Sequence, residues 1–313
     1  MGAMTLVYCR DCGHLSNRSF DESLMDYQAG YEAALDFSPR FRQYAKVLAN
    51  ELIQNYGLQG KSVLEVACGH GDFLNLLCEE GAKCGSGFDP SYAGCSAQSN
   101  NVDVKIVSDY YGEAYQHIKA DLVVCRHALE HIAEPRQFLK VLELGMSDGE
   151  ALLYIEVPNG LYTLSEMGIW DLIYEHCSYF SAPSISKLFE KANFEVRNVT
   201  ENYMGQFLAI EANTRKKGAD DYQTYVSVES VKELVEKFST NFNQKINEWE
   251  VKLEQYRRAG KKIIAWGGGA KGVSFLNFLK TENLINEIVD INFRKQGMYI
   301  AGTGQKYLLP EEL

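Results

Sequence analysis

The sequence predicts an α/β protein: an open parallel β-sheet with helices on both faces, joined to a second, smaller α/β lobe. Three observations lead to this prediction. Strand-like and helix-like segments alternate through the first two thirds of the chain, a long amphipathic segment comes next, and a short strand-turn-helix pattern follows it. Such alternation is typical of parallel sheets, because the connection between neighbouring parallel strands usually contains a helix.

The composition limits the class of protein. The chain has 313 residues, of which 46% are hydrophobic, so it can bury a large core. Its net charge of -11 would repel a phosphate backbone, and we therefore expect no nucleic-acid partner. No apolar run approaches the roughly 18 residues of a membrane span, so no membrane association is expected. A single C-x-x-C among eight cysteines is typical of a reduced compartment, which predicts a cytoplasmic protein.

The elements of the larger domain follow one another along the chain. Residues 1–39 show little apolar periodicity and are expected to form an N-terminal arm, the remnant of a small metal module. A helix is expected from Arg40 to Gly57, since apolar residues recur there every three or four positions. Strands are then expected at SVLEV, CGSGFD, VKIVSD, ADLVVCR, ALLYIEV, FEV and MGQFLAIEAN, with helices at LNLLCEEGA and SISKLFEKA. We place this domain at residues 40–213.

The remainder of the chain holds a long helix and the smaller lobe. Apolar residues keep helical spacing from Val228 nearly to Gly260, so residues 214–260 are interpreted as a linker and a long helix. The helix is expected to brace the two units, and its apolar stripe also suits a homodimer interface. A purely structural role for the chain would leave the motifs described below without a purpose. Residues 261–313, with strands at KKIIAW and INEIVD, are expected to form the C-terminal lobe.

Three successive strand ends carry residues suited to a nucleotide-like cofactor. Gly69 and Gly71 follow the first strand, whose end contains Glu65, and glycine lets a backbone turn approach a ligand closely. Asp89 ends the next strand, where a carboxylate can accept hydrogen bonds from ribose hydroxyls. Asp109 ends the third. Together with Glu65, these residues are the candidate cofactor site.

These stretches carry a resemblance to a known family. The segments VLEVACGHGDF, GFDPS, SDYY and DLVVCRHALEHI are similar to the cofactor motifs of class I S-adenosylmethionine-dependent methyltransferases, which have a Rossmann-like fold. The resemblance implies that Gly69 and Gly71 lie against the methionine part of the cofactor and that Asp89 holds its ribose. It also implies that Asp109 and Tyr110 flank the adenine.

Later stretches resemble a narrower group. The segments YEHCSYFS and GGGAKG, with IVDINFRKQGMYIAGTG, are similar to sugar C-methyltransferases of deoxysugar biosynthesis, which join a zinc module, a methyltransferase domain and a C-terminal Rossmann-like lobe. This resemblance implies C-methylation of a nucleotide-linked keto-deoxysugar through base-assisted enolate formation. The first alternative is an O- or N-methyltransferase that acts on another small metabolite. The second is an NAD-dependent oxidoreductase built on the C-terminal glycine loop.

The cysteine pair near the N-terminus supplies half of a zinc site. The family has two C-x-x-C pairs that make a four-cysteine site, whereas this chain has Cys9 and Cys12 alone. Tetrahedral zinc needs four ligands, and His14 would add at most a third.

The segment HALEH matches the H-x-x-E-H pattern of a group of zinc proteases. On a helix, His127 and His131 would face one way and could both bind a metal. The segment directly follows the fourth strand, however, and the cofactor pattern already accounts for it. We therefore expect His127 to lie near the cofactor, Glu130 to face solvent, and the protease pattern to be accidental.

Carbon methylation requires a base, because a C–H bond beside a ketone is only weakly acidic. Two segments near the strand ends offer suitable groups: His131 after the fourth strand, and Tyr174, Glu175 and His176 after the fifth. We predict these four residues to be catalytic, with the base drawn from His131, Glu175 or His176. The family tyrosine of the second segment falls at Ile173 without a gap, or at Tyr174 if one residue is deleted.

Three further residues are candidates for binding the acceptor. Tyr31, with Tyr27 as its alternative, matches a family tyrosine that enters the active site from the N-terminal segment. Asn159 follows the fifth strand, and Lys271 lies in AWGGGAKGVSF, where a helix N-terminus and a positive charge suit a diphosphate. This loop contains G-x-G-x-x-G, and Asp290 would complete a dinucleotide fingerprint, yet too few residues follow for a full dinucleotide domain and a catalytic domain.

Overall fold

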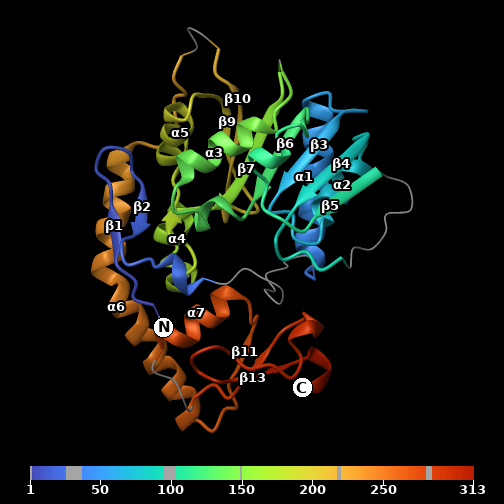
Figure 1. The fold of residues 1–313 in the computed structure, drawn as a ribbon. Coiled ribbons are helices and arrows are strands. Elements are labelled where there is room, and N and C mark those ends of the chain that lie inside the picture. The colour runs from blue at the N-terminus through green and yellow to red at the C-terminus, as the bar shows by residue number, and fades with distance from the viewer. Residues whose placement is uncertain (1, 26–36, 95–102, 149, 217–219, 280–283) are drawn as a thin grey trace.

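The larger part of the protein is built on one extended sheet. The computed structural model describes residues 2–25, 37–94, 103–148, 150–216, 220–279 and 284–313. The main sheet has seven strands in the spatial order β5-β4-β3-β6-β7-β10-β9 (Figure 1). Their bounds are β3 Ser62–Val66, β4 Cys84–Phe88, β5 Asp103–Val107, β6 Leu122–Arg126, β7 Leu152–Pro158, β9 Phe194–Asn202 and β10 Phe207–Thr214.

The sheet is parallel except at one edge. Strands β5 to β7 pair in parallel, as predicted. Strand β10 instead runs antiparallel to both β7 and β9, so the expectation of a wholly parallel sheet is wrong there. Tyr203, Met204 and Gly205 all have positive φ angles, which turns the chain back sharply into a hairpin. A parallel connection would have required a longer crossover.

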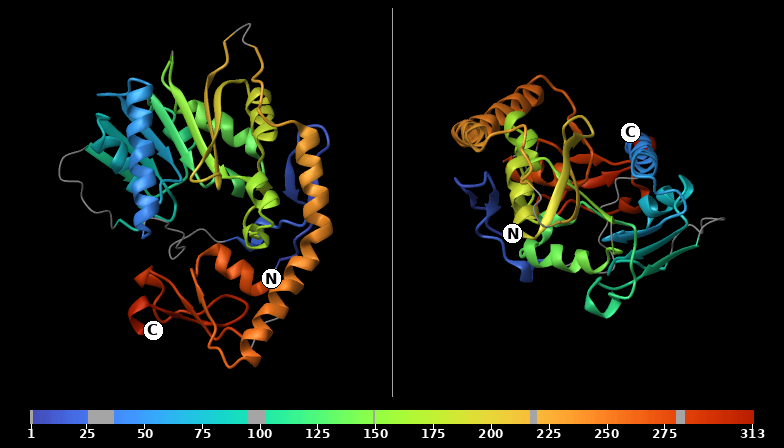
Figure 2. Two further views of the ribbon diagram at one scale, coloured as in Figure 1. Left: turned by 180° about the vertical axis from the view of Figure 1, so that it is seen from behind. Right: turned by 90° about the horizontal axis from the view of Figure 1, so that it is seen from above.

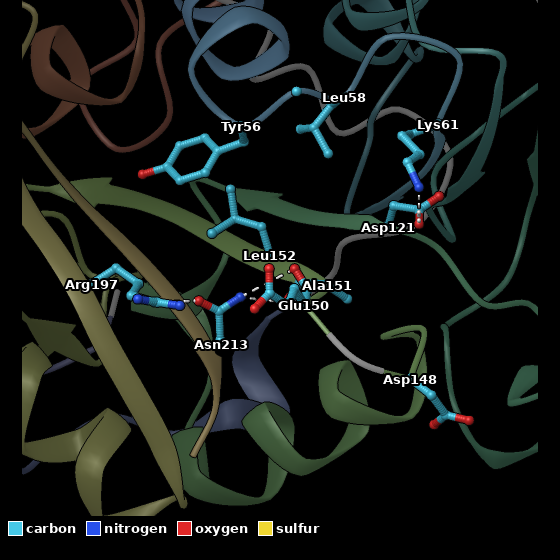
Figure 3. Close-up of a pocket in the computed structure, with 11 residues that line it drawn as sticks. Tyr56, Leu58, Lys61, Asp121, Asp148, Glu150, Ala151, Leu152, Arg197 and Asn213 are labelled. Carbon is cyan, nitrogen blue, oxygen red and sulfur yellow. Dashed lines mark hydrogen bonds and ion pairs between the residues drawn. The ribbon is translucent and has the colours of Figure 1, made fainter. Parts of the chain in front are cut away.

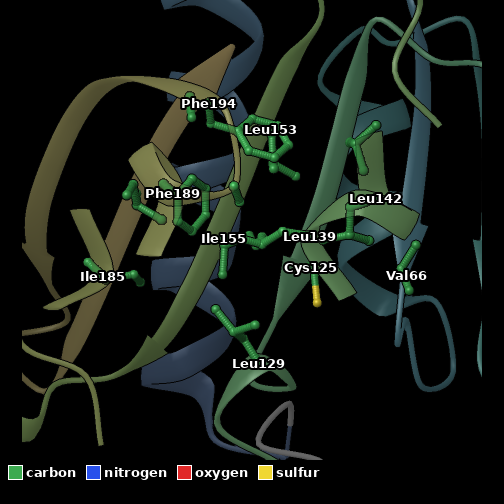
Figure 4. Packing of buried hydrophobic residues seen from close by; sticks show 14 of the residues in the cluster. Val66, Cys125, Leu129, Leu139, Leu142, Leu153, Ile155, Ile185, Phe189 and Phe194 are labelled. Carbon is green, nitrogen blue, oxygen red and sulfur yellow. The ribbon is translucent and has the colours of Figure 1, made fainter. Parts of the chain in front are cut away.

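Helices cover both faces of the sheet. On one face lie α1 (Pro39–Asn55) and α2 (Asp72–Glu79), whose apolar side chains form one core cluster with β3, β6 and β7. On the other face lie α3 (Pro135–Leu144) and α5 (Ala182–Lys191). Figure 4 shows how the side chains of these two helices pack on those of the strands, among them Leu139 on α3 and Phe189 on α5, both fully buried.

The N-terminal segment is folded onto the main domain. Strands β1 (Leu6–Tyr8) and β2 (Leu15–Asn17) form an antiparallel hairpin, and β2 also pairs with β8 (Ser178–Tyr179). The hairpin lies beside the long helix α6 (Figure 1), and the Tyr8 hydroxyl donates a hydrogen bond of 2.9 Å to the backbone oxygen of Val228. This sheet joins residues far apart in sequence, which explains why local patterns did not predict it.

The long helix is present as predicted. Helix α6 (Val228–Arg258) begins at Ser227, whose hydroxyl accepts a hydrogen bond of 3.1 Å from the backbone nitrogen of Ser230. It ends just before Gly260, which has a φ of 69°. Figure 2 shows α6 running along one side of the molecule from the sheet domain to the C-terminal lobe. Among the described residues, no helix combines the length and apolar character needed to cross a membrane.

The C-terminal lobe is a small parallel unit. It contains β11 (Ile264–Trp266), α7 (Ala270–Phe278), β12 (Glu287–Val289) and β13 (Lys306–Leu308), with the strands in the order β11-β12-β13. Helix α7 packs on the 3₁₀ turn Ile169–Asp171 of the main domain. Phe275 of α7 contacts both Trp170 of that turn and Trp249 of α6. Because Ile169–Asp171 lies beyond the carboxyl end of β7, the lobe sits opposite that edge of the main sheet (Figure 2).

Candidate active site

The turn after β3 is shaped to leave room for a ligand. Gly69 has a φ of 55°, and the place where its side chain would project is open space. Its backbone nitrogen donates a hydrogen bond of 2.8 Å to Oδ2 of Asp89, at the end of β4. The other oxygen of Asp89 accepts bonds from the backbone nitrogen and hydroxyl of Ser91. Gly71, the N-cap of α2, differs from Gly69 because a side chain there would collide with Ile106.

The third strand end adds an exposed aromatic ring. Asp109 follows β5 and accepts hydrogen bonds of 2.6 Å from the Tyr115 hydroxyl and 2.8 Å from the backbone nitrogen of Tyr110. These bonds, that of Tyr115 foremost, hold the pKa of Asp109 below its usual value. Tyr110 is 68% exposed. Glu65, in contrast, is buried in β3. The three strand ends therefore fit a nucleoside cofactor, with an open glycine turn, two carboxylates and an accessible ring.

A buried ion pair fixes the turn after β6. His127 has a φ of 53°, and its backbone nitrogen donates a hydrogen bond to the backbone oxygen of Glu156. Its side-chain Nε2 lies 3.2 Å from the carboxylate oxygen Oε1 of Glu156. Arg126 lies 2.9 Å from the same carboxylate, which Tyr44 also contacts. Burial alone would raise the pKa of Glu156, but the Arg126 guanidinium and the bond from His127 outweigh it and lower the pKa. The protease pattern therefore fails at His127, which faces Glu156 rather than His131.

Glu130 is buried, so the expectation that it faces solvent is wrong. Glu130 is only 2% exposed, because Leu129–His131 forms a 3₁₀ turn that packs against β7 and β8 instead of starting a surface helix. Burial raises the pKa of its carboxyl group to about 8. Sequence reasoning missed this residue, although its place next to His131 in LEH was a signal for it.

The structure brings His131 and His176 together. Their rings lie 4.8 Å apart at 90° to each other. His131 Nδ1 lies 3.0 Å from the backbone oxygen of Glu175, and a carbonyl can only accept, so we assign a proton to this nitrogen. Burial lowers the pKa of His131 to about 4 and that of His176 well below its usual value. Both imidazoles are therefore neutral at neutral pH.

The tyrosine of the same segment faces elsewhere. The Tyr174 hydroxyl accepts a hydrogen bond of 3.2 Å from the backbone nitrogen of Asp21, and its ring lies 6.0 Å from that of Phe20. Ile173 is buried and exchanges two backbone hydrogen bonds with the Tyr179 hydroxyl. The side chain of Glu175 is half-buried. Tyr27 and Tyr31 lie outside the described residues.

The predicted acceptor-binding residues have partners within the protein. Asn159 caps the helix Gly160–Ser165 (α4) by accepting a hydrogen bond of 3.0 Å from the Leu161 nitrogen, and it donates one to the Gly205 oxygen. Lys271, in the first turn of α7, lies 2.6 Å from Oδ1 of Asp171 and 3.2 Å from Oε1 of Gln206. Lys271 therefore bridges the C-terminal lobe and the main domain.

The glycine loop of the lobe repeats a bond seen in the main domain. The Gly268 nitrogen donates a hydrogen bond of 2.9 Å to Oδ2 of Asp290, as Gly69 does to Asp89. Lys295 lies 3.3 Å from the same oxygen of Asp290. The two domains thus share one way of fixing a glycine turn against the next strand end.

The N-terminal cysteines do not gain a third ligand from the described residues. His14 packs its ring 5.1 Å from that of Phe180, and burial lowers its pKa to about 4. Among the described residues, the group of three or more donors able to hold a metal ion consists of Glu130, His131 and His176, and it excludes Cys9 and Cys12.

A pocket at the opposite edge of the sheet is not part of this site. Figure 3 shows it beside Lys61, Asp121 and Leu152, at or just before the starts of β3, β6 and β7. Lys61 pairs with Asp121 across it at 3.6 Å. Open parallel sheets bind ligands beyond the carboxyl ends of their strands, so the edge that carries Gly69 is the candidate site.

Known proteins resemble the chain in two blocks. Residues 38–199 match the methyltransferase domain family, and residues 197–313 match the C-methyltransferase C-terminal domain. A curated relative, the ubiquinone biosynthesis O-methyltransferase of Salmonella paratyphi A, is 32% identical over 111 residues. That match covers 33% of this chain and 46% of the relative, less than half of its length.

Solved structures of methyltransferases also resemble the chain. One is the 1,6-didemethyltoxoflavin-N1-methyltransferase of Burkholderia thailandensis, at 15% identity and a TM-score of 0.45, over 67% of this chain and 99% of that one. Another is an S-adenosylmethionine-dependent methyltransferase from Clostridium acetobutylicum, at 13% identity and a TM-score of 0.47, over 56% and 92% of the two chains. The match to the methyltransferase domain covers more than half of the sequence. The chain therefore belongs to the class I S-adenosylmethionine-dependent methyltransferases and carries a C-methyltransferase C-terminal domain.

Proposed function

We propose that the protein transfers a methyl group from S-adenosylmethionine to a carbon atom beside the ketone of a nucleotide-linked keto-deoxysugar. One observation carries the proposal: a C-methyltransferase C-terminal domain is docked opposite the strand edge at which the buried His176 and the half-buried His131, both neutral, meet. Carbon methylation needs a base in a dry place, and few other groups stay unprotonated there at neutral pH.

The residues assigned to the cofactor lie at or near the carboxyl edge of the sheet. S-adenosylmethionine would supply an electrophilic methyl group. We assign Asp89 to its ribose and Asp109 with Tyr110 to its adenine, while Gly69 leaves room for its methionine part. Gly71 contributes by letting α2 start close to Ile106, and Glu65 supports the turn from within β3. His127 is assigned to orienting the neighbouring turn, through its contact with Glu156.

The base is assigned to His176 or Glu175. When the C–H bond beside the ketone breaks, the proton goes to one of these side chains and the electron pair becomes the enolate. His131 orients this segment, since its Nδ1 donates to the Glu175 backbone oxygen. Exclusion of water strengthens every charge interaction around the enolate.

The acceptor is assigned to the space between the two domains. Lys271 and the N-terminus of α7 would hold its diphosphate, and the lysine retains exposed surface despite its contact with Asp171. Tyr174 is assigned to the N-terminal side of this space, and Asn159 to shaping it through its cap on α4. Tyr31 stays a candidate for binding the acceptor on the basis of the sequence alone. We infer that the shape of this space determines which nucleotide is bound and which carbon is methylated.

Hydrogen exchange into the acceptor tests this function. The protein is incubated in deuterated water with S-adenosylhomocysteine and a nucleotide-linked keto-deoxysugar, and NMR follows the hydrogens beside the ketone. We expect exchange, and we expect its rate to fall at least about a hundredfold in either His176→Gln or Glu175→Gln, whichever removes the base, since general bases typically contribute that much. His117→Gln, an exposed histidine elsewhere, should exchange normally.

The alternative is methylation of oxygen, the activity in the name of the curated relative. No exchange, together with a methyl group on a hydroxyl of the acceptor, would favour that alternative and refute the proposed base.

A further inference from the structure

The geometry points to a binding site for a divalent transition-metal ion of the zinc type, formed by Glu130, His131 and His176. Each residue offers one ligand atom, and these atoms all lie within 4.8 Å of one another. Two imidazoles and one carboxylate are a ligand set that zinc uses in catalytic sites, where a further position stays open for water or substrate. Iron and related ions bind similar sets.

The carboxylate of Glu130 supplies an independent observation. Its side chain is 3% exposed and its Oε1 lies 3.9 Å from Nε2 of His131, beyond hydrogen-bond distance. Its Oε2 is fully buried and has no hydrogen-bond partner among the described residues. Buried polar atoms without a partner are costly and uncommon enough to call for an explanation such as a bound ion.

The two histidines are prepared for the same role. Because Nδ1 of His131 carries the proton that is donated to the Glu175 oxygen, its lone pair lies on Nε2, the nitrogen that faces Glu130. Histidines that bind metals usually donate their second nitrogen to a backbone carbonyl or a carboxylate in this way. His176 presents its ring at 90° to that of His131, so its nitrogen can approach the same point from another direction.

The ligand set differs from the one that the sequence pattern suggested. In H-x-x-E-H, the two histidines bind the metal, but here His127 is turned towards Glu156. Glu130 and His131 of the motif remain, and His176 from the segment before β8 takes the third place. The three ligands are thus brought together by a contact between segments distant in sequence, and not by their spacing along one helix.

The role of the ion in the reaction rests on the function proposed above, whereas the binding itself does not. A divalent ion at this place would meet the ketone oxygen of the acceptor and stabilise the charge of the enolate. With His176 engaged as a ligand, the proton from the broken C–H bond goes to the carboxylate of Glu175. The electron pair of that bond forms the enolate, so no oxidant or further reactant is needed.

Direct metal titration tests the site without reference to activity. The full chain carrying Cys9→Ser and Cys12→Ser, which removes the two N-terminal thiols, is stripped with a chelator and titrated with Co²⁺ and Zn²⁺. We expect one ion per chain by calorimetry and a visible Co²⁺ absorption spectrum without sulfur charge-transfer bands. Glu130→Gln should raise the dissociation constant at least about tenfold, since even residues that only support metal ligands contribute that much. His176→Gln should act likewise, and His117→Gln should bind as tightly as the parent.

Circular dichroism and thermal unfolding verify that each variant is folded, and Glu130→Gln keeps the size of the side chain. Absence of binding by the folded parent, or equal binding by Glu130→Gln, would overturn the metal site. Deuterium exchange that persists in metal-free protein which binds no ion would refute the site and leave the proposed function standing. Metal binding without any exchange would refute the function and leave the site standing.

Discussion

At the scale of single residues, the buried charge of Glu156 is neutralised by the groups around it. Glu156 is fully buried, and its carboxylate is contacted by Arg126, His127 and Tyr44. These contacts lie at the start of the turn that leads to Glu130. The sequence marked His127 but not its partners, because Glu156 lies on the neighbouring strand β7 and meets Arg126 only through sheet pairing. The burial of Glu130 was not predicted for a similar reason, since it depends on how the 3₁₀ turn packs.

The buried pair predicts a large effect of one substitution. Glu156→Gln leaves the Arg126 guanidinium buried without a counter-charge, so the free energy of unfolding should fall by about 3–5 kcal/mol. Chemical denaturation at neutral pH measures this. Glu150→Gln, which breaks the exposed pair with Lys216, is the control and should change stability by less than about 1 kcal/mol. A similar loss in both variants would contradict the account.

The same pair has a defined pH dependence. The pKa of Glu156 is lower in the folded protein than its ordinary value of 4.5, so its stabilising contribution is complete above that value. It is lost progressively as the pH falls towards the folded pKa. The acid sensitivity of Glu156→Gln should accordingly be shallower than that of the parent.

At the scale of elements, local patterns predicted well wherever the pattern alone decides the structure. The strands β3 to β7 and the helix α6 formed where hydrophobic periodicity placed them. The hairpin of β9 and β10 and the pairing of β2 with β8 were missed, because they depend on turn geometry and on contacts between distant segments. The protease pattern H-x-x-E-H, expected to be accidental, does not lie on one helix, because Leu129–His131 forms a 3₁₀ turn.

The turn between β3 and α2 separates a ligand effect from a packing effect. Gly69 and Gly71 both have positive φ angles, but only a side chain at Gly71 would meet Ile106. Gly69→Ala should lower the free energy of unfolding by about 1–2 kcal/mol through backbone strain and weaken binding of S-adenosylhomocysteine at least tenfold. Gly71→Ala should lose a similar amount from backbone strain and only a little more from packing, because the atom it would meet is the flexible end of the Ile106 side chain.

Thermal unfolding and calorimetry with S-adenosylhomocysteine distinguish the two variants. If Gly69→Ala bound the cofactor product as tightly as the parent, the assignment of this turn to the cofactor would be wrong.

At the scale of the whole molecule, two bridges hold the C-terminal lobe against the main domain. Lys271 reaches Asp171 beyond β7, and Arg294 lies 3.0 Å from Nε2 of His70 in the glycine turn. Phe293, next to Arg294, packs its ring 5.5 Å from that of Phe37. The division at residues 214 and 261 remains our proposal for the domain boundaries, with α6 as the brace between the two units. The candidate cofactor turn and the lobe are thus in contact, which places the acceptor between them in our proposal.

In the proposed reaction the methyl group is transferred to carbon. The most direct measurement supplies S-adenosylmethionine labelled with carbon-13 in its methyl group, together with a nucleotide-linked keto-deoxysugar, and follows the product by NMR. We expect a labelled methyl group coupled to a ring carbon next to the ketone. A labelled methyl group on a sugar oxygen or on a nitrogen would contradict it.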